Sequence, residues 1–229
     1  MNTEKEINEN LFLLYKSYID IMEKQYPELR AELYSSVYCT TAPAEWTNSE
    51  NRFLIIGEEG YGKKPHFPTA EEEVLWAQEF NADYLRQQLY ENRDNRSRFW
   101  QRFRRISEFG KCSWSNFDKI HNQKDNSSRN NCPLSENDRA KLHSLPPLLK
   151  REIDYLSPTL IIFFGWHWVS LKHELPSVYD KMKMLDKPGR VKPLLIEDDN
   201  KKYLVAYHPS FRTREYEDTI ISLINETIG

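Results

Sequence analysis

The chain alternates short, wholly apolar runs with longer segments in which apolar residues recur every three or four positions. The first pattern is typical of buried parallel strands, and the second is typical of amphipathic helices. The apolar runs cover residues 53–56, 160–164 and 203–207, and weaker strand patterns cover 113–120 and 192–197. The alternation of strands and helices predicts an α/β domain built in layers.

Helical spacing is interrupted at defined positions. Pro27 breaks the first helical segment, because proline lacks a backbone N–H. Thr69 and Glu72 have the spacing of a helix cap and its partner. We expect helices over residues 6–34, 69–109, 133–156 and 216–228, and a short helix after Gly165. The prediction is a three-layer α/β/α sandwich with a central, mostly parallel sheet of about four to five strands.

No linker rich in glycine, serine or proline divides the 229 residues, so we expect one domain over 1–229. Residues 1–50 are expected to form a helical N-terminal extension packed on it. No apolar run approaches the roughly 18 residues of a membrane span. The first residues are polar and acidic, and three scattered cysteines are too few for a disulfide framework or an iron–sulfur cluster. We expect a cytoplasmic monomer without a membrane partner.

Two polar loops carry the candidate chemistry. Residues 57–62, Gly-Glu-Glu-Gly-Tyr-Gly, follow the first apolar run, and residues 208–210, His-Pro-Ser, follow the last. Parallel strands place ligands at their carboxyl ends, so the loops can meet if both strands lie in one sheet. The first loop lacks the spacing of a phosphate-binding loop. Its carboxylates could orient water, stabilise a cation, bind a metal together with His208, or simply form a turn.

Six arginines lie between residues 93 and 105, interleaved with Phe99, Trp100 and Phe103. One interpretation is an amphipathic helix with buried aromatic residues and solvated arginines. The other is a basic face that contacts nucleic-acid phosphates. The net charge of −3 weakens a nucleic-acid function but does not exclude it, because local patches matter more than the sum.

Three ordered pieces of the sequence resemble the uracil-DNA glycosylase superfamily. Residues 57–62 look like its first motif, which reads GQDPYHG in one family and GEAPG in another. Residues 114–119, Trp-Ser-Asn-Phe-Asp-Lys, are similar to a central strand in which an asparagine reads the flipped base and an N-x-x-K pattern is common. Residues 208–210 match the HPS of the second motif, and Gly165 ends a strand at a similar place.

The resemblance implies a monofunctional DNA glycosylase with that superfamily's fold, acting on DNA without metal or cofactor. Glu59 falls where one family has a water-orienting aspartate, and Glu58 falls where another has a glutamate. His208 would bond the leaving base. An acid near the sugar and a donor near the base suit the charges that develop when an N-glycosidic bond breaks. No lysine lies in either motif to form a Schiff base, so the mechanism is expected to be hydrolytic.

Further residues are expected to hold the DNA. By the resemblance, Asn116 reads the base edge and Tyr61 excludes a 5-methyl group. Phe67 or Trp76 could stack on a base, although core packing explains Trp76 better. The full expected set comprises Asn116, Tyr61, Gly57 and Phe67 for the base, and Ser210, Arg212, Lys119, Arg98 and Arg102 for the DNA backbone.

The sequence also departs from the superfamily. Gly60 replaces the motif proline, and Glu59 is one methylene longer than aspartate. The resemblance therefore implies that the excised base is uracil or another damaged or modified base, which could be a bulky one of the kind found in phage DNA. Two other functions stay open: a non-catalytic nucleic-acid-binding module on the same fold, and a metal-dependent hydrolase that uses Glu58, Glu59 and His208.

Overall fold

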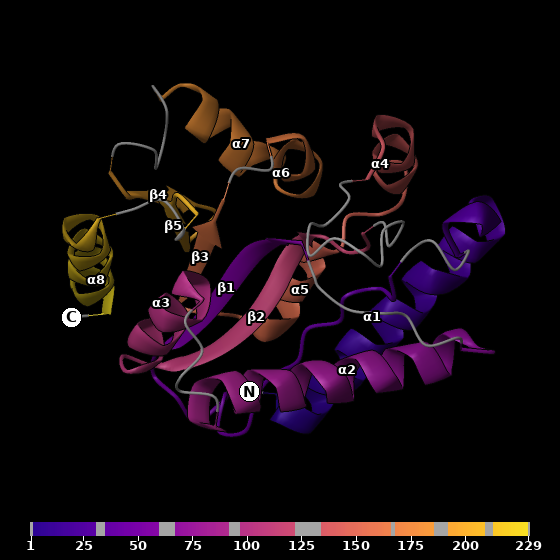
Figure 1. The fold of residues 1–229 in the computed structure, drawn as a ribbon, viewed down its shortest axis with the longest axis horizontal. Coiled ribbons are helices and arrows are strands. Elements are labelled where there is room, and N and C mark those ends of the chain that lie inside the picture. Colours follow the sequence, from indigo (N-terminus) through magenta and orange to yellow (C-terminus); the bar gives the residue numbers. More distant parts are fainter. Residues whose placement is uncertain are drawn as a thin grey trace.

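The computed structural model describes residues 2–30, 35–59, 67–91, 97–121, 134–165, 168–185, 192–208 and 213–228. A five-stranded sheet lies between layers of helices, which confirms the predicted α/β/α sandwich (Figure 1). The strand order is β2-β1-β3-β5-β4. The strands are β1 (Arg52–Glu59), β2 (Lys111–Asp118), β3 (Leu160–Phe164), β4 (Leu194–Asp198) and β5 (Lys201–Ala206).

Neighbouring strands are parallel except at one edge, where β4 runs antiparallel to β5. A tight turn joins these two strands, and Asp199 and Asn200 adopt φ values of 49° and 59° there. Two consecutive residues with positive φ are the requirement of a type I′ hairpin turn, which aspartate and asparagine tolerate well. The predicted strand at 192–197 is therefore real but belongs to a hairpin.

The helices are α1 (Glu4–Gln25), α2 (Ala70–Arg86), α3 (Arg98–Ser107), α4 (Glu136–Leu142), α5 (Leu149–Leu156), α6 (Trp168–Glu174), α7 (Pro176–Lys183) and α8 (Arg214–Ile228). A short 3-10 helix, η1, covers Pro27–Arg30, and a π-helical turn, η2, covers Gln87–Glu91. The break at Pro27 and the Thr69 cap appear as predicted, with the Glu72 N–H donating to Thr69 Oγ1 at 3.2 Å. One short helix was expected after Gly165, and the structure has two, α6 and α7.

The two faces of the sheet carry separate hydrophobic cores. On what we call the α5 face, Leu54 and Ile56 of β1 pack in a cluster to which α1, α5, α6 and α7 contribute. On the α3 face, Phe53 and Ile55 pack in a cluster with residues of α3 and α8. All four strand residues are fully buried, which is why β1 is apolar on both sides. Helices α3 and α8 lie on one side of the sheet in Figure 1, and α1 and α5 lie on the other.

The N-terminal segment contributes to the α5-face core through α1, which packs against α2 and α5. Among the described residues, no helix is both long and apolar enough to cross a membrane.

Candidate functional site

The carboxyl ends of the parallel strands lie along one edge of the sheet. In sheet order, this edge carries Asn116 of β2, the last residues of β1, Gly165 after β3, and His208 two residues beyond β5. Residues 57–59, predicted to begin the first polar loop, are instead the last residues of β1. Residues 57–59 and His208 nevertheless lie at the same edge of one sheet. The pieces come from segments far apart in the chain and are brought together only by the sheet.

Asn116 lies directly beside Gly57, because the two residues pair in the parallel ladder of β1 and β2. Its side chain is completely buried, and within the part of the chain that the structure describes neither Nδ2 nor Oδ1 has a hydrogen-bond partner. A Cβ atom on Gly57 would lie 2.8 Å from Asn116 Oδ1, so only glycine leaves room for the amide. A buried amide without partners is costly in a native protein, and such a group at a strand end is a candidate for ligand recognition.

Trp114 precedes Asn116 by two residues, so both side chains lie on the α3 face of the sheet. The indole Nε1 of Trp114 is also buried and has no partner among the described residues. It lies 3.3 Å from the position of a Cβ on Gly57. Two such polar atoms, Asn116 Oδ1 and Trp114 Nε1, therefore lie next to Gly57. Trp114 is not among the site residues predicted from the sequence, although its two-residue offset from Asn116 was a usable signal.

His208 is half-buried and follows Tyr207, whose backbone N–H and carbonyl both form hydrogen bonds. The N–H of Tyr207 donates to Tyr216 Oη at 2.8 Å, and its carbonyl accepts from Arg102 Nη1 at 3.4 Å. Arg102 is itself 3% exposed and forms an ion pair with Glu217 at 2.9 Å. Burial lowers the pKa of the Arg102 guanidinium. The predicted phosphate contact by Arg102 is wrong, because its charge is neutralised inside the protein; we assign it to the support of the His208 segment.

Lys119 is also an internal residue. It is 4% exposed, and its Nζ lies 2.6 Å from Glu152 Oε1 and donates to Ser115 Oγ at 2.6 Å. Tyr15 donates to the same carboxylate at 2.6 Å. The predicted DNA contact by Lys119 is therefore corrected as well. This network lies beneath β2 on the α5 face and fixes the strand that carries Asn116.

The arginine-rich segment is mostly paired within the protein. Among its described arginines, Arg104 donates to the Gln88 carbonyl at 2.9 Å, and Arg105 bonds Asp218 of α8 at 2.6 Å. Arg98, at the start of α3, is exposed. The interpretation of this segment as an amphipathic helix holds for α3, with the addition that acidic residues of α8 pair with two of its arginines.

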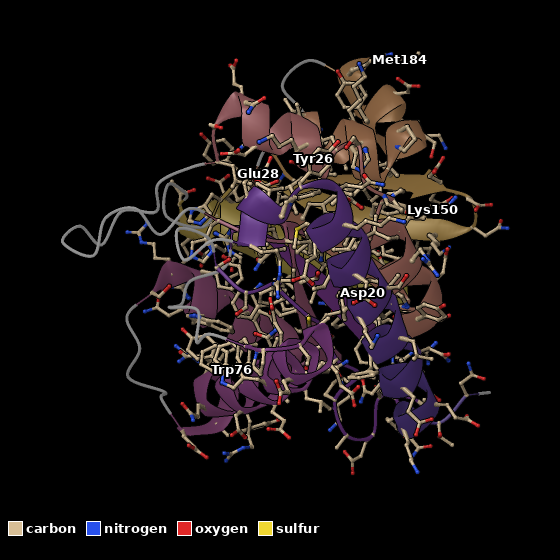
Figure 2. All side chains as sticks on the ribbon, turned by 90° about the vertical axis from the view of Figure 1, so that its right-hand side faces the viewer. Asp20, Tyr26, Glu28, Trp76, Lys150 and Met184 are labelled. Atoms are coloured by element: carbon tan, nitrogen blue, oxygen red, sulfur yellow. The ribbon has the colours of Figure 1, made fainter. Side chains whose placement is uncertain are left out.

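An aromatic ladder runs along α2. Phe67 is half-buried, with its ring centroid 5.3 Å from that of Trp76, which in turn stacks on Phe80 at 5.0 Å. Phe80 stacks on Tyr84, whose ring lies 6.0 Å from that of Trp114. Figure 2 labels Trp76 on this helix. Trp76 also packs partly against the α5-face core. Through Tyr84, the ladder extends from Phe67 to Trp114, two residues before Asn116.

Several predicted site residues cannot be placed. Tyr61, Ser210 and Arg212 lie outside the described residues. The backbones of Glu58 and Glu59 end β1, but their side chains are not described. Among the side chains that are described, no group of three or more histidine, cysteine, aspartate or glutamate residues could hold a metal ion.

No protein-family model matches the sequence, and no curated protein matches it.

Proposed function

We propose that the protein is a DNA glycosylase that hydrolyses the N-glycosidic bond of a flipped uracil or of another damaged or modified base in DNA. One observation carries the proposal: the buried, unpartnered amide of Asn116 lies beside Gly57 at the sheet edge from which His208 also extends. An asparagine amide offers a donor and an acceptor side by side, which suits the edge of a base. The three-part sequence resemblance supplies the reaction.

The proposed chemistry needs an acid near the sugar and a donor near the base. The bond between C1′ and the base nitrogen breaks, and its electron pair leaves with the base. Water oxygen then adds to C1′, and the proton that it loses finally neutralises the base. Glu59 orients the water and stabilises the positive sugar, with Glu58 as the alternative acid. His208 donates a hydrogen bond to the leaving base, and no metal or cofactor takes part.

DNA is the proposed partner, and the target base leaves the stack before it reacts, at a cost of a few kcal/mol. Arg98 is proposed as a phosphate contact, because it is exposed at the start of α3. Ser210 and Arg212 are proposed as backbone contacts on the resemblance alone. We propose a monomer in the reducing cytoplasm, where the thiols of Cys39 and Cys112, free and buried in the structure, would stay reduced.

A base-release assay tests the proposal. Single- and double-stranded oligonucleotides, each with one uracil, deaminated purine or phage-type modified cytosine, are incubated with the protein. Free base is identified by mass spectrometry, and abasic sites are cleaved with alkali. We expect one class of substrate to release its base. The variants Glu59→Gln, His208→Ala and Asn116→Ala should lose release while DNA binding stays measurable.

Two results would overturn this function. Binding to DNA without base release from any substrate would favour a non-catalytic module. Base release or another hydrolysis that is lost in chelator and restored by a divalent ion would favour a metal-dependent hydrolase.

A further inference from the structure

We propose that the indole N–H of Trp114 is a second recognition donor, which acts with the Asn116 amide to read one edge of the bound heterocycle. The inference rests on the proposed function and deepens it, because it adds a specificity-determining residue to the same site. It starts from three buried polar atoms that have no hydrogen-bond partner among the described residues: Asn116 Nδ2, Asn116 Oδ1 and Trp114 Nε1. Two of them, Asn116 Oδ1 and Trp114 Nε1, lie next to Gly57.

The backbone of Trp114 is anchored from outside its own strand. Its carbonyl accepts a hydrogen bond from Thr40 Oγ1 at 2.6 Å and one from Tyr38 Oη at 3.4 Å. Thr40 is in turn held by Tyr15, whose hydroxyl accepts from the Thr40 N–H at 2.9 Å. The strand position that carries the indole is therefore fixed by the segment between α1 and β1.

The indole ring is confined as well. Tyr38 and Trp100 pack edge-to-face on it, with centroid distances of 5.0 Å and 5.1 Å. Tyr84 and Phe99 lie at 6.0 Å on tilted planes. Each such aromatic pair contributes about 0.5–1.5 kcal/mol beyond the burial of area, so turning the ring toward another acceptor would disrupt several contacts. The N–H is thus held where the described residues provide it with no hydrogen-bond partner.

The polar groups define what a ligand must offer. Trp114 Nε1 and Asn116 Nδ2 need acceptors, and Asn116 Oδ1 needs a donor. The matching edge has at least two acceptors and one donor. Uracil, with two carbonyls and an N–H, meets this demand, and so does cytosine, with a carbonyl, a ring nitrogen and an amino group. The pairing edge of hypoxanthine offers one carbonyl and one N–H, which leaves one donor of the protein unsatisfied. The expected preference is therefore for pyrimidine edges.

Nuclear magnetic resonance tests this directly on the wild-type protein. The six tryptophans give six indole N–H signals, and that of Trp114 is assigned by its loss in Trp114→Phe. We expect titration with free uracil or cytosine to shift this signal, and hypoxanthine to leave it in place. Asn116→Ala should weaken the shift. An unmoved Trp114 signal in the presence of each base at millimolar concentration would overturn the inference. If Trp114→Phe does not fold, sequential assignment of the wild-type signal keeps the experiment decisive.

Kinetics provides the second measurement. Trp114→Phe keeps an aromatic ring and removes the N–H, and we expect the preference in kcat/KM for pyrimidine over hypoxanthine substrates to fall roughly tenfold, as for one lost neutral hydrogen bond. Trp46→Phe is the control, because it removes an indole N–H from the α5-face core, where Trp46 Nε1 donates to the Leu156 carbonyl at 2.8 Å, and it should leave the preference unchanged. An unchanged preference in Trp114→Phe, with base release intact, would defeat the role of Trp114 and leave the glycosylase standing. A shifted indole signal without any base release would defeat the glycosylase and leave a base-binding site.

Discussion

Tyr216 accepts a hydrogen bond of 2.8 Å from the backbone N–H of Tyr207, the residue directly before His208. The carbonyl of Tyr207 accepts a second bond, at 3.4 Å, from Arg102 of α3. Two helices on the α3 face thus fix the backbone from which the candidate catalytic imidazole extends. Catalytic groups depend on such support, because small displacements of a reacting group reduce rates strongly.

Replacing Tyr216 by phenylalanine tests this support. The loss of one hydrogen bond should lower the free energy of unfolding by about 1 kcal/mol and reduce kcat for base release while KM stays nearly constant. Denaturant unfolding and single-turnover kinetics measure the two effects. Tyr155→Phe on α5, at the other face of the sheet, is the control. A kcat equal to that of the wild type would show that His208 does not need this contact.

Asn116 and Asn81 form a matched pair for a second prediction. Both are buried, but Asn81 Nδ2 donates to the Cys39 carbonyl, whereas no described residue bonds to the Asn116 amide. Asn116→Ala should therefore leave the free energy of unfolding unchanged or raise it, and Asn81→Ala should lower it by about 1–3 kcal/mol. Base release should disappear in Asn116→Ala. Equal destabilisation of both variants would mean that Asn116 is a structural residue.

Gly57→Ala should remove activity without unfolding the protein. The new Cβ would lie 2.8 Å from the side-chain oxygen of Asn116, so the amide must move away from its position. Gly110→Ala is the comparison, because its Cβ would lie 2.5 Å from the backbone carbonyl oxygen of Asn51, which cannot rotate aside. We expect a much larger loss of thermal stability for Gly110→Ala, measured by calorimetry. Full activity in Gly57→Ala would contradict the assignment of the site.

The salt dependence of DNA binding separates Arg98 from Lys119. Removal of exposed Arg98 should reduce the slope of log K against log salt by about one, as for one lost phosphate contact. Lys119→Met should leave the slope unchanged and lower the free energy of unfolding by about 3–5 kcal/mol, because Glu152 loses its cation in the interior. A reduced slope in Lys119→Met would return that lysine to the DNA interface.

Glu174 provides a prediction about pH. It is 8% exposed, its carboxylate accepts a bond from the Leu149 N–H at 2.7 Å, and burial raises its pKa from 4.5 to about 7. Between these values the folded state holds a proton that the unfolded chain releases, so this group lowers stability as pH rises from 4.5 to 7. Glu174→Gln keeps the acceptor and removes the titration. We compare the free energies of unfolding of this variant and of the wild type, measured with denaturant at several pH values. The difference should change in favour of the variant by about 3 kcal/mol between pH 4.5 and 7. A constant difference would contradict the raised pKa.

The sequence predicts the helices and strands of this fold better than it predicts which charged side chains form ion pairs. Wholly apolar runs identify β1, β3 and β5, because a strand buried on both faces needs apolar side chains at every position. Arg102 and Lys119 were predicted at the DNA because nothing local reveals their carboxylates. Glu217 lies 115 residues from Arg102, and Glu152 lies 33 residues from Lys119. Such pairings are decided by which helices the fold brings to each face.

The candidate site, too, could be predicted from the sequence only in part. Its placement at the strand ends follows from parallel topology and could be predicted. That no described residue bonds to the Asn116 amide could not be predicted. This property depends on what surrounds the amide in space, including Gly57 on the neighbouring strand.

The β4–β5 hairpin also determines how the chain must assemble during synthesis. When the ribosome has released residues up to Phe164, β2, β1 and β3 can pair, but β3 is then an edge strand made only of apolar residues. Exposed apolar edges recruit other chains and promote aggregation. The β4–β5 hairpin covers this edge of β3. A hairpin forms within about 1–10 μs once its residues have been synthesised. We therefore expect the nascent protein to be most prone to aggregation, and most dependent on chaperones, in the interval between the emergence of β3 and that of β5.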